Sequence, residues 1–237
     1  MLPEYPYSIF PLGDSAVTID FGNVIDEAIN KKILAFFSKL RKEPFYGMIE
    51  AVPAYSSLSI FYDPVILRKN ISASGTILDH IKEEIEKFIR QTFDVNPELS
   101  AIIKVPVCYD KEFGTDLERI SELKKIEKEE IVRLHCSKLY RVYMIGFLPG
   151  FPYMGEADEK IYVPRKSQPE NVASGSVAIA GRQIGIYSLA SPGGWSVIGR
   201  TPLKLFDATK KNPSLFNAGD TVEFYSISKD EFLNIQK

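Results

Sequence analysis

Glycine and proline are concentrated in one part of this 237-residue chain, between Gly146 and Asp207. The stretch is about a quarter of the chain, yet it holds nine of the fifteen glycines and six of the fifteen prolines. Both residues interrupt regular elements and specify turns, so the stretch can form only short strands between frequent turns. The sequence therefore predicts a mainly β barrel or sandwich in the C-terminal part. Strands are expected at residues 140–147, 176–180, 183–188, 195–200 and 221–226.

The first ninety residues have a different pattern, in which strands and helices alternate. Period-two alternation predicts strands at residues 16–21, 48–52 and 57–62, and helical spacing predicts amphipathic helices at 26–41 and 73–90. This order is typical of an α+β domain with helices on one face of a sheet. We place the boundary at Asp94–Pro97, between an α+β domain at 1–95 and a β domain at 96–237. The second domain is expected to begin with a strand at 101–108 and two short helices, the first with capping-box spacing at 115–118.

Charge and composition argue against several classes of protein. The formal net charge of −2 gives no overall attraction to nucleic acid or to anionic membranes. No apolar run approaches the roughly 18–20 residues that span a bilayer, and the N-terminus lacks the features of a signal peptide. We therefore expect a cytoplasmic protein with no nucleic-acid or membrane partner. Cys108 and Cys136, with only two histidines in the chain, favour two small semi-buried thiols over a disulfide, a zinc site or a catalytic thiol.

Two turn segments early in the glycine- and proline-rich stretch could bind a ligand. The first runs from Gly146 to Gly155, where glycines allow close backbone approach, prolines stiffen the loop, and aromatic residues including Tyr153 supply apolar walls. A purely structural barrel corner is an equally good interpretation. The second is Val163–Arg165, in which Arg165 could form a fork for a carboxylate or phosphate. A surface ion pair is the commoner use of a lone arginine.

Two later segments also carry candidate binding residues. Gln183 and Tyr187 are four residues apart in an expected strand, so both side chains should lie on one face and could hydrogen-bond a polar ligand or each other. The turn at Gly193 and Gly194 could present consecutive N–H groups to an anion. Trp195, the only tryptophan, and Arg200 follow this turn. A ligand pocket and an interface would both use such residues.

The chain lacks the motifs of several self-sufficient active sites. It contains no P-loop, no nucleophile elbow and no His-Glu-x-x-His zinc motif, and we expect no metal site. The glycine- and proline-rich stretch has no histidine, so it offers binding groups without an acid–base pair. We therefore expect a partner protein to complete the site. His135 is the best proton-transfer candidate in the chain, although a core or helix-capping role fits it equally well.

At these segments the sequence resembles the family of 5-oxoprolinase B subunits, also described as KipI-type kinase inhibitors and allophanate hydrolase subunit 1. The matching segments are residues 146–155, 164–166, 175–187 and 191–207, with weaker matches at 11–22, 52–58 and 105–117 and in the His135 helix. The resemblance implies an α+β N-terminal domain followed by a cyclophilin-like β-barrel. It also implies one component of an ATP-dependent hydrolase complex, inactive alone, that works with 5-oxoprolinase subunits A and C to open 5-oxoproline to L-glutamate. The small-molecule substrate would then be a lactam or amide.

The resemblance leaves alternative functions open, and this sequence departs from the usual family pattern at some positions. The family names also imply an inhibitor of a sensor histidine kinase, whose helices could be bound by Phe147, Phe151 and Trp195, or a protein that processes allophanate or urea. Residues Glu170, Ala173 and Ile184 depart from the usual family pattern, and Glu170 reverses an expected positive charge. That reversal weakens the expectation that this loop binds an anion. Cyclophilin-like shape does not by itself imply prolyl isomerase activity.

Overall fold

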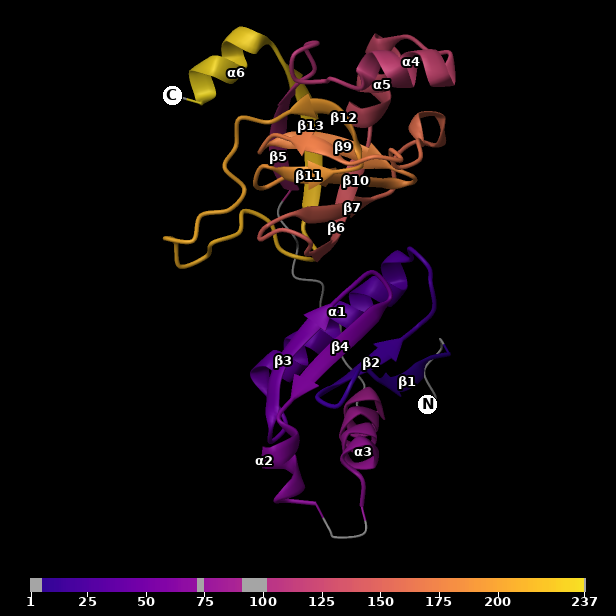
Figure 1. Cartoon of the computed structure of the whole chain (residues 1–237), viewed down its shortest axis with the longest axis vertical. Coiled ribbons are helices and arrows are strands. Elements are labelled where there is room, and N and C mark those ends of the chain that lie inside the picture. Colours follow the sequence, from indigo (N-terminus) through magenta and orange to yellow (C-terminus); the bar gives the residue numbers. More distant parts are fainter. Residues whose placement is uncertain (1–5, 72–74, 91–101, 237) are drawn as a thin grey trace. The chain divides into compact units, whose positions relative to one another are not determined.

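The computed structural model describes residues 6–71, 75–90 and 102–236, and the chain forms two units (Figure 1). One unit comprises residues 1–98 and the other residues 99–237. The boundary predicted at Asp94–Pro97 lies outside the described residues. None of the helices in the described ranges is long and apolar enough to cross a membrane.

The N-terminal unit is a four-stranded antiparallel sheet with helices packed on one face. Its elements are β1 (Ser8–Pro11), β2 (Ala16–Asp20), α1 (Glu27–Lys42), β3 (Met48–Pro53), β4 (Ser57–Tyr62), α2 (Pro64–Arg68) and α3 (Ile77–Arg90), and the strand order is β1-β2-β4-β3. Alternate residues of β2 and β4, such as Ile19 and Ile60, are fully buried against Ile33 and Leu40 of α1. The unit thus combines helices with a sheet, as the alternating patterns predicted.

Three details of this unit differ from the sequence prediction. The helix expected from residue 73 begins at Ile77, where the hydroxyl of Thr76 accepts from the Asp79 N–H. Strand β1 and helix α2 were not predicted. Helix α2 forms because the Asp63 carboxylate accepts from two backbone N–H groups of the first turn and Pro64 supplies the fixed φ of its first position.

The C-terminal unit is a closed seven-stranded β-barrel (Figure 1). Its elements are β5 (Ile102–Cys108), α4 (Leu117–Lys124), α5 (Lys128–Cys136), β6 (Leu139–Ile145), β7 (Pro152–Gly155), a 3-10 turn (Glu159–Ile161), β8 (Glu170–Val172), β9 (Ser176–Ala180), β10 (Gln183–Ile186), β11 (Ser191–Gly193), β12 (Ser196–Arg200), β13 (Thr221–Ile227) and α6 (Lys229–Ile235). The strand order around the barrel is β10-β7-β6-β13-β5-β12-β9, and β8 pairs with β11 in a separate two-stranded ribbon. The mainly β nature of this part is confirmed.

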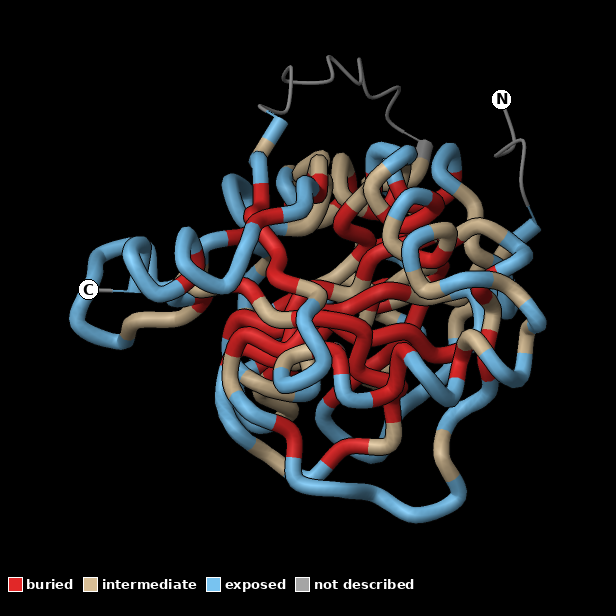
Figure 2. Tube along the Cα trace, turned by 90° about the horizontal axis from the view of Figure 1, so that it is seen from above, coloured by how far each residue is buried: buried red, intermediate tan, exposed pale blue. Residues whose placement is uncertain are grey.

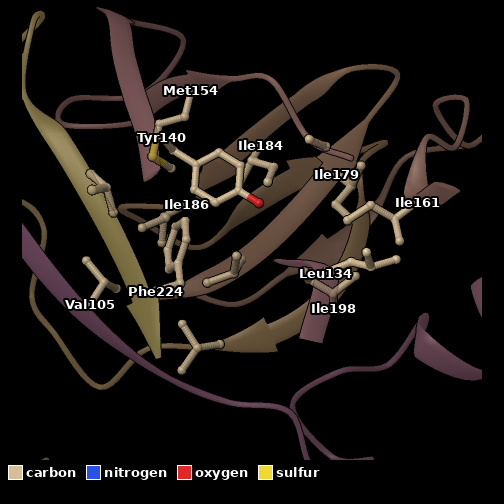
Figure 3. Close-up of a cluster of buried hydrophobic side chains, with 14 of the residues drawn as sticks. Val105, Leu134, Tyr140, Met154, Ile161, Ile179, Ile184, Ile186, Ile198 and Phe224 are labelled. Atoms are coloured by element: carbon tan, nitrogen blue, oxygen red, sulfur yellow. The ribbon is translucent and has the colours of Figure 1, made fainter. Parts of the chain in front are cut away.

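Alternation along the barrel strands explains the core. Ile184 and Ile186 of β10 are fully buried in the barrel interior, while Gly185 between them faces the other side of the wall. Buried positions run along the strands (Figure 2). Figure 3 shows Tyr140 of β6 and Phe224 of β13 packed with the β10 isoleucines in the interior.

The N-terminus of helix α4 differs from the sequence prediction. The predicted capping box at 115–118 is wrong, because α4 begins at Leu117 with Asp116 in the N-cap position and makes no side-chain cap. The Asp116 carboxylate instead accepts from the backbone N–H of Val197 in β12, at 2.7 Å.

Strands β7, β8 and β11 and helix α6 were also not predicted. The three strands have only three or four residues each, and β7 and β11 contain proline, so they show little alternation.

Candidate functional site

The outer face of one barrel wall is lined by small residues, which lets large side chains lie directly on the backbone. Ala178 and Ala180 of β9 belong to a buried cluster on this face, whereas their neighbour Ile179 points into the barrel. A methyl group added at Gly185 would come within 2.5 Å of the Phe151 ring and 3.0 Å of Trp195. The wall therefore forms a shallow floor on which aromatic rings pack.

Five aromatic residues on this floor form what we call the aromatic cluster: Phe147, Phe151, Tyr153, Tyr187 and Trp195. Phe151 lies at its centre, with ring centroids 4.8 Å from Tyr153, 5.3 Å from Tyr187 and 5.6 Å from Trp195. The rings meet edge to face or tilted, which is the favourable arrangement for aromatic pairs. Residues from the first, third and fourth predicted segments are thus brought together.

Phe147 is the exposed member of the cluster. It is 61% exposed, whereas Phe151 and Trp195 are 1% and 5% exposed. The expectation that these three aromatics together bind partner helices is therefore not supported, because two of them are buried in the chain's own fold. Phe147 also has φ of 63°, a left-handed conformation that is uncommon for a bulky residue and is often found at functional loops.

The turn at Gly193 and Gly194 holds Tyr187 in place. The Tyr187 hydroxyl occupies the space that a Cβ at Gly193 would take, so a side chain at this position would overlap it. The backbone of Trp195 also acts on this hydroxyl, because it offsets part of the rise in the Tyr187 pKa that burial causes. The carbonyl of Gly194 accepts from the Lys166 N–H at 2.7 Å. These contacts hold Tyr187 and the loop that carries Arg165, and anion binding by the N–H groups of Gly193 and Gly194 stays a prediction.

Arg165 lies over the cluster with its charge unpaired among the described residues. Its guanidinium carbon is 5.7 Å from the centroid of the Trp195 ring, a cation–π arrangement. In the described part of the chain, no carboxylate lies within ion-pair distance of this guanidinium. The surface ion pair that was the alternative interpretation is therefore not present there. Arg165 has the charge and the donor fork to bind a carboxylate or phosphate.

The phenols beside Arg165 stay protonated at neutral pH. Burial raises the pKa of Tyr153 and of Tyr187, and the positive charge of Arg165 offsets only part of that effect. Both hydroxyls are therefore neutral hydrogen-bonding groups, and neither is suited to act as a general base at this pH. Neither phenol of this candidate site therefore supplies a general base.

Lys166 and Asp116 form an ion pair next to the cluster that the sequence interpretation missed. The Lys166 ammonium lies 2.8 Å from Asp116 and 2.7 Å from Glu170. Burial lowers the pKa of Lys166, but hydrogen bonds and charge from these two carboxylates outweigh it and raise the pKa above its ordinary value. Both residues lie in segments that matched the family, at 105–117 and 164–166. Each residue could therefore have been selected from its segment, but the pairing could not be predicted, because fifty residues separate Asp116 from Lys166.

Two predicted site residues lie away from the centre of the cluster. Gln183 shares the outer face of β10 with Gly185 and is half-buried, opposite Gly155 of β7. The predicted common face for Gln183 and Tyr187 agrees with this alternation, although β10 itself ends at Ile186. Arg200 lies five residues beyond Trp195, at the far end of the extended strand β12, and its Nε donates to the Ser174 carbonyl at 2.7 Å. The structure does not bring Arg200 to Arg165.

The expected proton-transfer role of His135 is not supported by its position. His135 is 0% exposed on α5 and packs against Tyr140 and Phe224 of the barrel core. Its Nδ1 lies 2.6 Å from the Tyr109 hydroxyl, and its Nε2 is buried with no hydrogen-bond partner among the described residues. Burial lowers the pKa of His135 to about 3. An imidazole with this pKa and no exposed surface stays neutral and does not reach a substrate at the aromatic cluster.

His135 should instead make the stability of the chain depend on pH. Because the folded pKa of His135 is below the ordinary value of 6.5, the unfolded chain binds one more proton than the folded chain between pH 6.5 and pH 3. The contribution of His135 to stability is therefore complete above that window and is lost as the pH falls through it. We expect His135 to account for a loss of about 2 kcal/mol in the free energy of unfolding between pH 7 and pH 5. Urea denaturation of His135→Gln should show a smaller loss over this range, whereas His80→Gln should behave as the native chain. Equal pH dependence in both variants would contradict the assignment.

The two cysteines have the properties of structural thiols. Cys108 is buried, Cys136 is half-buried, and both are free. Burial raises the pKa of each thiol, which disfavours the thiolate that a nucleophile requires. Neither cysteine is among the described residues that form the aromatic cluster. The interpretation of two semi-buried thiols is therefore favoured over catalytic thiol chemistry.

Comparison with known proteins assigns this architecture to a family. The family model described as carboxyltransferase domain, subdomain C and D, matches residues 7–216. The chain belongs to this carboxyltransferase-domain family. It is 40% identical to a protein of Bacillus subtilis (strain 168) that is named as the B subunit of 5-oxoprolinase, over 95% of each chain. It is 36% identical to the protein of the same name from Escherichia coli O157:H7, over 90% of this chain and 93% of that one. The resemblance to 5-oxoprolinase B subunits is thus confirmed.

Other similar proteins and solved structures are less similar or longer. The crystal structure of TTHA0988 superposes with a TM-score of 0.75 at 32% identity, covering 90% of this chain and 40% of that one. Relatives named urea amidolyase, from Lachancea kluyveri and Saccharomyces cerevisiae, are 25% and 24% identical, and the chain matches 13% of their length. The comparisons therefore favour the 5-oxoprolinase interpretation over the urea-processing alternative.

Proposed function

We propose that this chain is the B subunit of an ATP-dependent 5-oxoprolinase complex and that the aromatic cluster with Arg165 holds the substrate. The observation that carries the proposal is the Arg165 guanidinium, stacked on Trp195 and unpaired among the described residues. The substrate, 5-oxoproline, has one carboxylate on a small lactam ring, whose carbon atoms offer apolar surface beside the polar amide. The aromatic cluster provides a charged fork at Arg165, which lies over Trp195, and an exposed aromatic ring at Phe147, and these two features match the carboxylate and the ring of that molecule.

The chemistry of the substrate explains why such a site needs other subunits. A lactam is an unactivated amide, so its ring carbon reacts poorly with water. Transfer of the terminal phosphoryl group of ATP to the lactam oxygen, with release of ADP, would make that carbon electrophilic. Attack by water, cleavage of the C–N bond and release of phosphate would then give L-glutamate. The phenols near Arg165 are neutral and His135 is in the core, so we assign proton transfer and ATP binding to residues of subunits A and C.

Reconstitution tests this proposal directly. The chain is purified with subunits A and C, and glutamate released from 5-oxoproline and ATP is measured. We expect no release from the chain alone, release from the complete mixture, and loss of activity when this chain is omitted. A mixture of A and C that works equally well without it would refute the proposal. Allophanate in place of 5-oxoproline separates the urea-type alternative, which predicts turnover of allophanate instead.

A further inference from the structure

The ammonium group of Lys166 lies between two carboxylates that are held very differently. Asp116 is nearly buried, at 9% side-chain exposure, and Lys166 itself is 11% exposed. Glu170 is 64% exposed. The two oxygens lie at similar distances from the ammonium, 2.8 Å for Asp116 and 2.7 Å for Glu170. Distance alone therefore does not distinguish them, but burial does.

Asp116 is fixed by contacts that do not involve Lys166. One of its oxygens accepts from the Val197 N–H at 2.7 Å, and the other is 3.2 Å from Nε of Arg119. Arg119 in turn donates to the Ser196 hydroxyl at 2.5 Å. Within the described ranges, the side chain of Glu170 has one partner, the Lys166 ammonium. An exposed ion pair of this kind contributes little to stability, so the Glu170 carboxylate can leave at small cost.

The pair stands at the edge of the aromatic cluster. Glu170 in β8 is paired across the two-stranded ribbon with Gly193 in β11, the residue that lies against the Tyr187 hydroxyl. The backbone of Lys166 bonds to Gly194, and the preceding residue, Arg165, stacks on Trp195. The positive charges of Arg165 and Lys166 both act to lower the pKa of Tyr187. The charges of Arg165 and Lys166 therefore both act at the Tyr187 hydroxyl. Among the described residues, carboxylates pair with Lys166 and none pairs with Arg165.

We propose that Glu170 is a displaceable counter-ion that sets the affinity of this site for anionic ligands. In the free chain it occupies the outer position on the Lys166 ammonium. The carboxylate of an entering ligand takes that position, so that Lys166 and Arg165 hold it together while Asp116 keeps Lys166 in place. The inference rests on the proposed function for the identity of the ligand as 5-oxoproline. Glu170 is thus a specificity-determining residue that need not touch the reacting atoms.

The test removes the charge of Glu170 and follows ligand binding to the full chain. Trp195 is the only tryptophan, so its fluorescence reports on the site. The probes are 5-oxoproline, acetate, which has the carboxylate alone, and 2-pyrrolidinone, which has the lactam alone. In Glu170→Gln we expect about fivefold tighter binding of 5-oxoproline and acetate and no change for 2-pyrrolidinone. The matched control is Glu118→Gln, since Glu118 is 61% exposed, pairs with Lys128 at 2.8 Å, and does not belong to the cluster; it should bind as the native chain does.

A second variant shows whether the gain passes through Lys166. Adding Lys166→Met to Glu170→Gln should abolish the gain in affinity, and the Asp116–Arg119 contact should keep the fold, as checked by thermal unfolding. The inference is overturned if Glu170→Gln binds both acids no more tightly than the native chain, or if Glu118→Gln gains as much. Acetate keeps this test separate from the proposed function. If Glu170→Gln binds acetate more tightly but the reconstituted complex does not turn over 5-oxoproline, the counter-ion role of Glu170 is supported and 5-oxoproline is rejected as the substrate.

Discussion

Arg165→Ala should lower kcat/KM for 5-oxoproline about 100-fold in the reconstituted complex, because a charged, two-pronged hydrogen-bond donor is lost. Its guanidinium is exposed and makes no ion pair among the described residues, so the fold does not depend on it. The free energy of unfolding should therefore change by less than about 0.5 kcal/mol. Steady-state kinetics and urea denaturation measure the two effects separately.

Two further variants make the Arg165 result specific. Arg165→Lys keeps the charge but not the planar fork, and we expect an intermediate loss. Arg133→Ala removes another exposed arginine, one that pairs with Glu130 on α5 at 2.6 Å, and should leave kcat/KM unchanged. If Arg165→Ala retained native kinetics while Arg133→Ala did not, the site would have to lie elsewhere on the barrel.

The second large effect is expected from a methyl group at Gly193. An alanine side chain there would overlap the Tyr187 hydroxyl and come within 2.6–2.7 Å of its ring carbons. Tyr187 is 1% exposed and packed edge to face on Phe151, so it cannot move aside freely. We expect Gly193→Ala to cost about 2 kcal/mol of stability and most of the activity, since overpacking displaces the ring or the turn. Urea denaturation, glutamate release and Trp195 fluorescence measure these effects.

Its neighbour supplies the matched control. A methyl group at Gly194 would lie 3.4 Å from the nearest atom, the Lys166 carbonyl oxygen, which is an ordinary contact. Gly194→Ala should therefore fold and act much as the native chain does. The double variant Gly193→Ala with Tyr187→Phe should recover part of the stability, because the overlapping hydroxyl is gone. Equal damage at both glycines, or no recovery in the double variant, would show that the Tyr187 contact is not the cause.

Local sequence patterns predicted most of the barrel strands and selected the segments that form the aromatic cluster. Glycine and proline between Gly146 and Asp207 fixed the turns, and period-two alternation located β9, β12 and β13 to within one residue. Short elements such as strand β11 and helix α2 were not predicted, because three to five residues are too few to show a periodic pattern. In the same way, the segments that hold Trp195, Tyr187 and Arg165 could be selected by residue type and spacing alone.

The chain by itself thus determined which segments can turn, alternate and supply binding groups, because those properties depend on near neighbours in sequence. The tertiary structure alone decided which groups meet and which are desolvated. Barrel closure brings Arg165 onto Trp195 and Lys166 to Asp116, leaves Arg200 at the far end of β12, and buries His135. Charge pairing and pKa depend on distance through space and on contact with water, and neither is encoded in the spacing of residues along the chain.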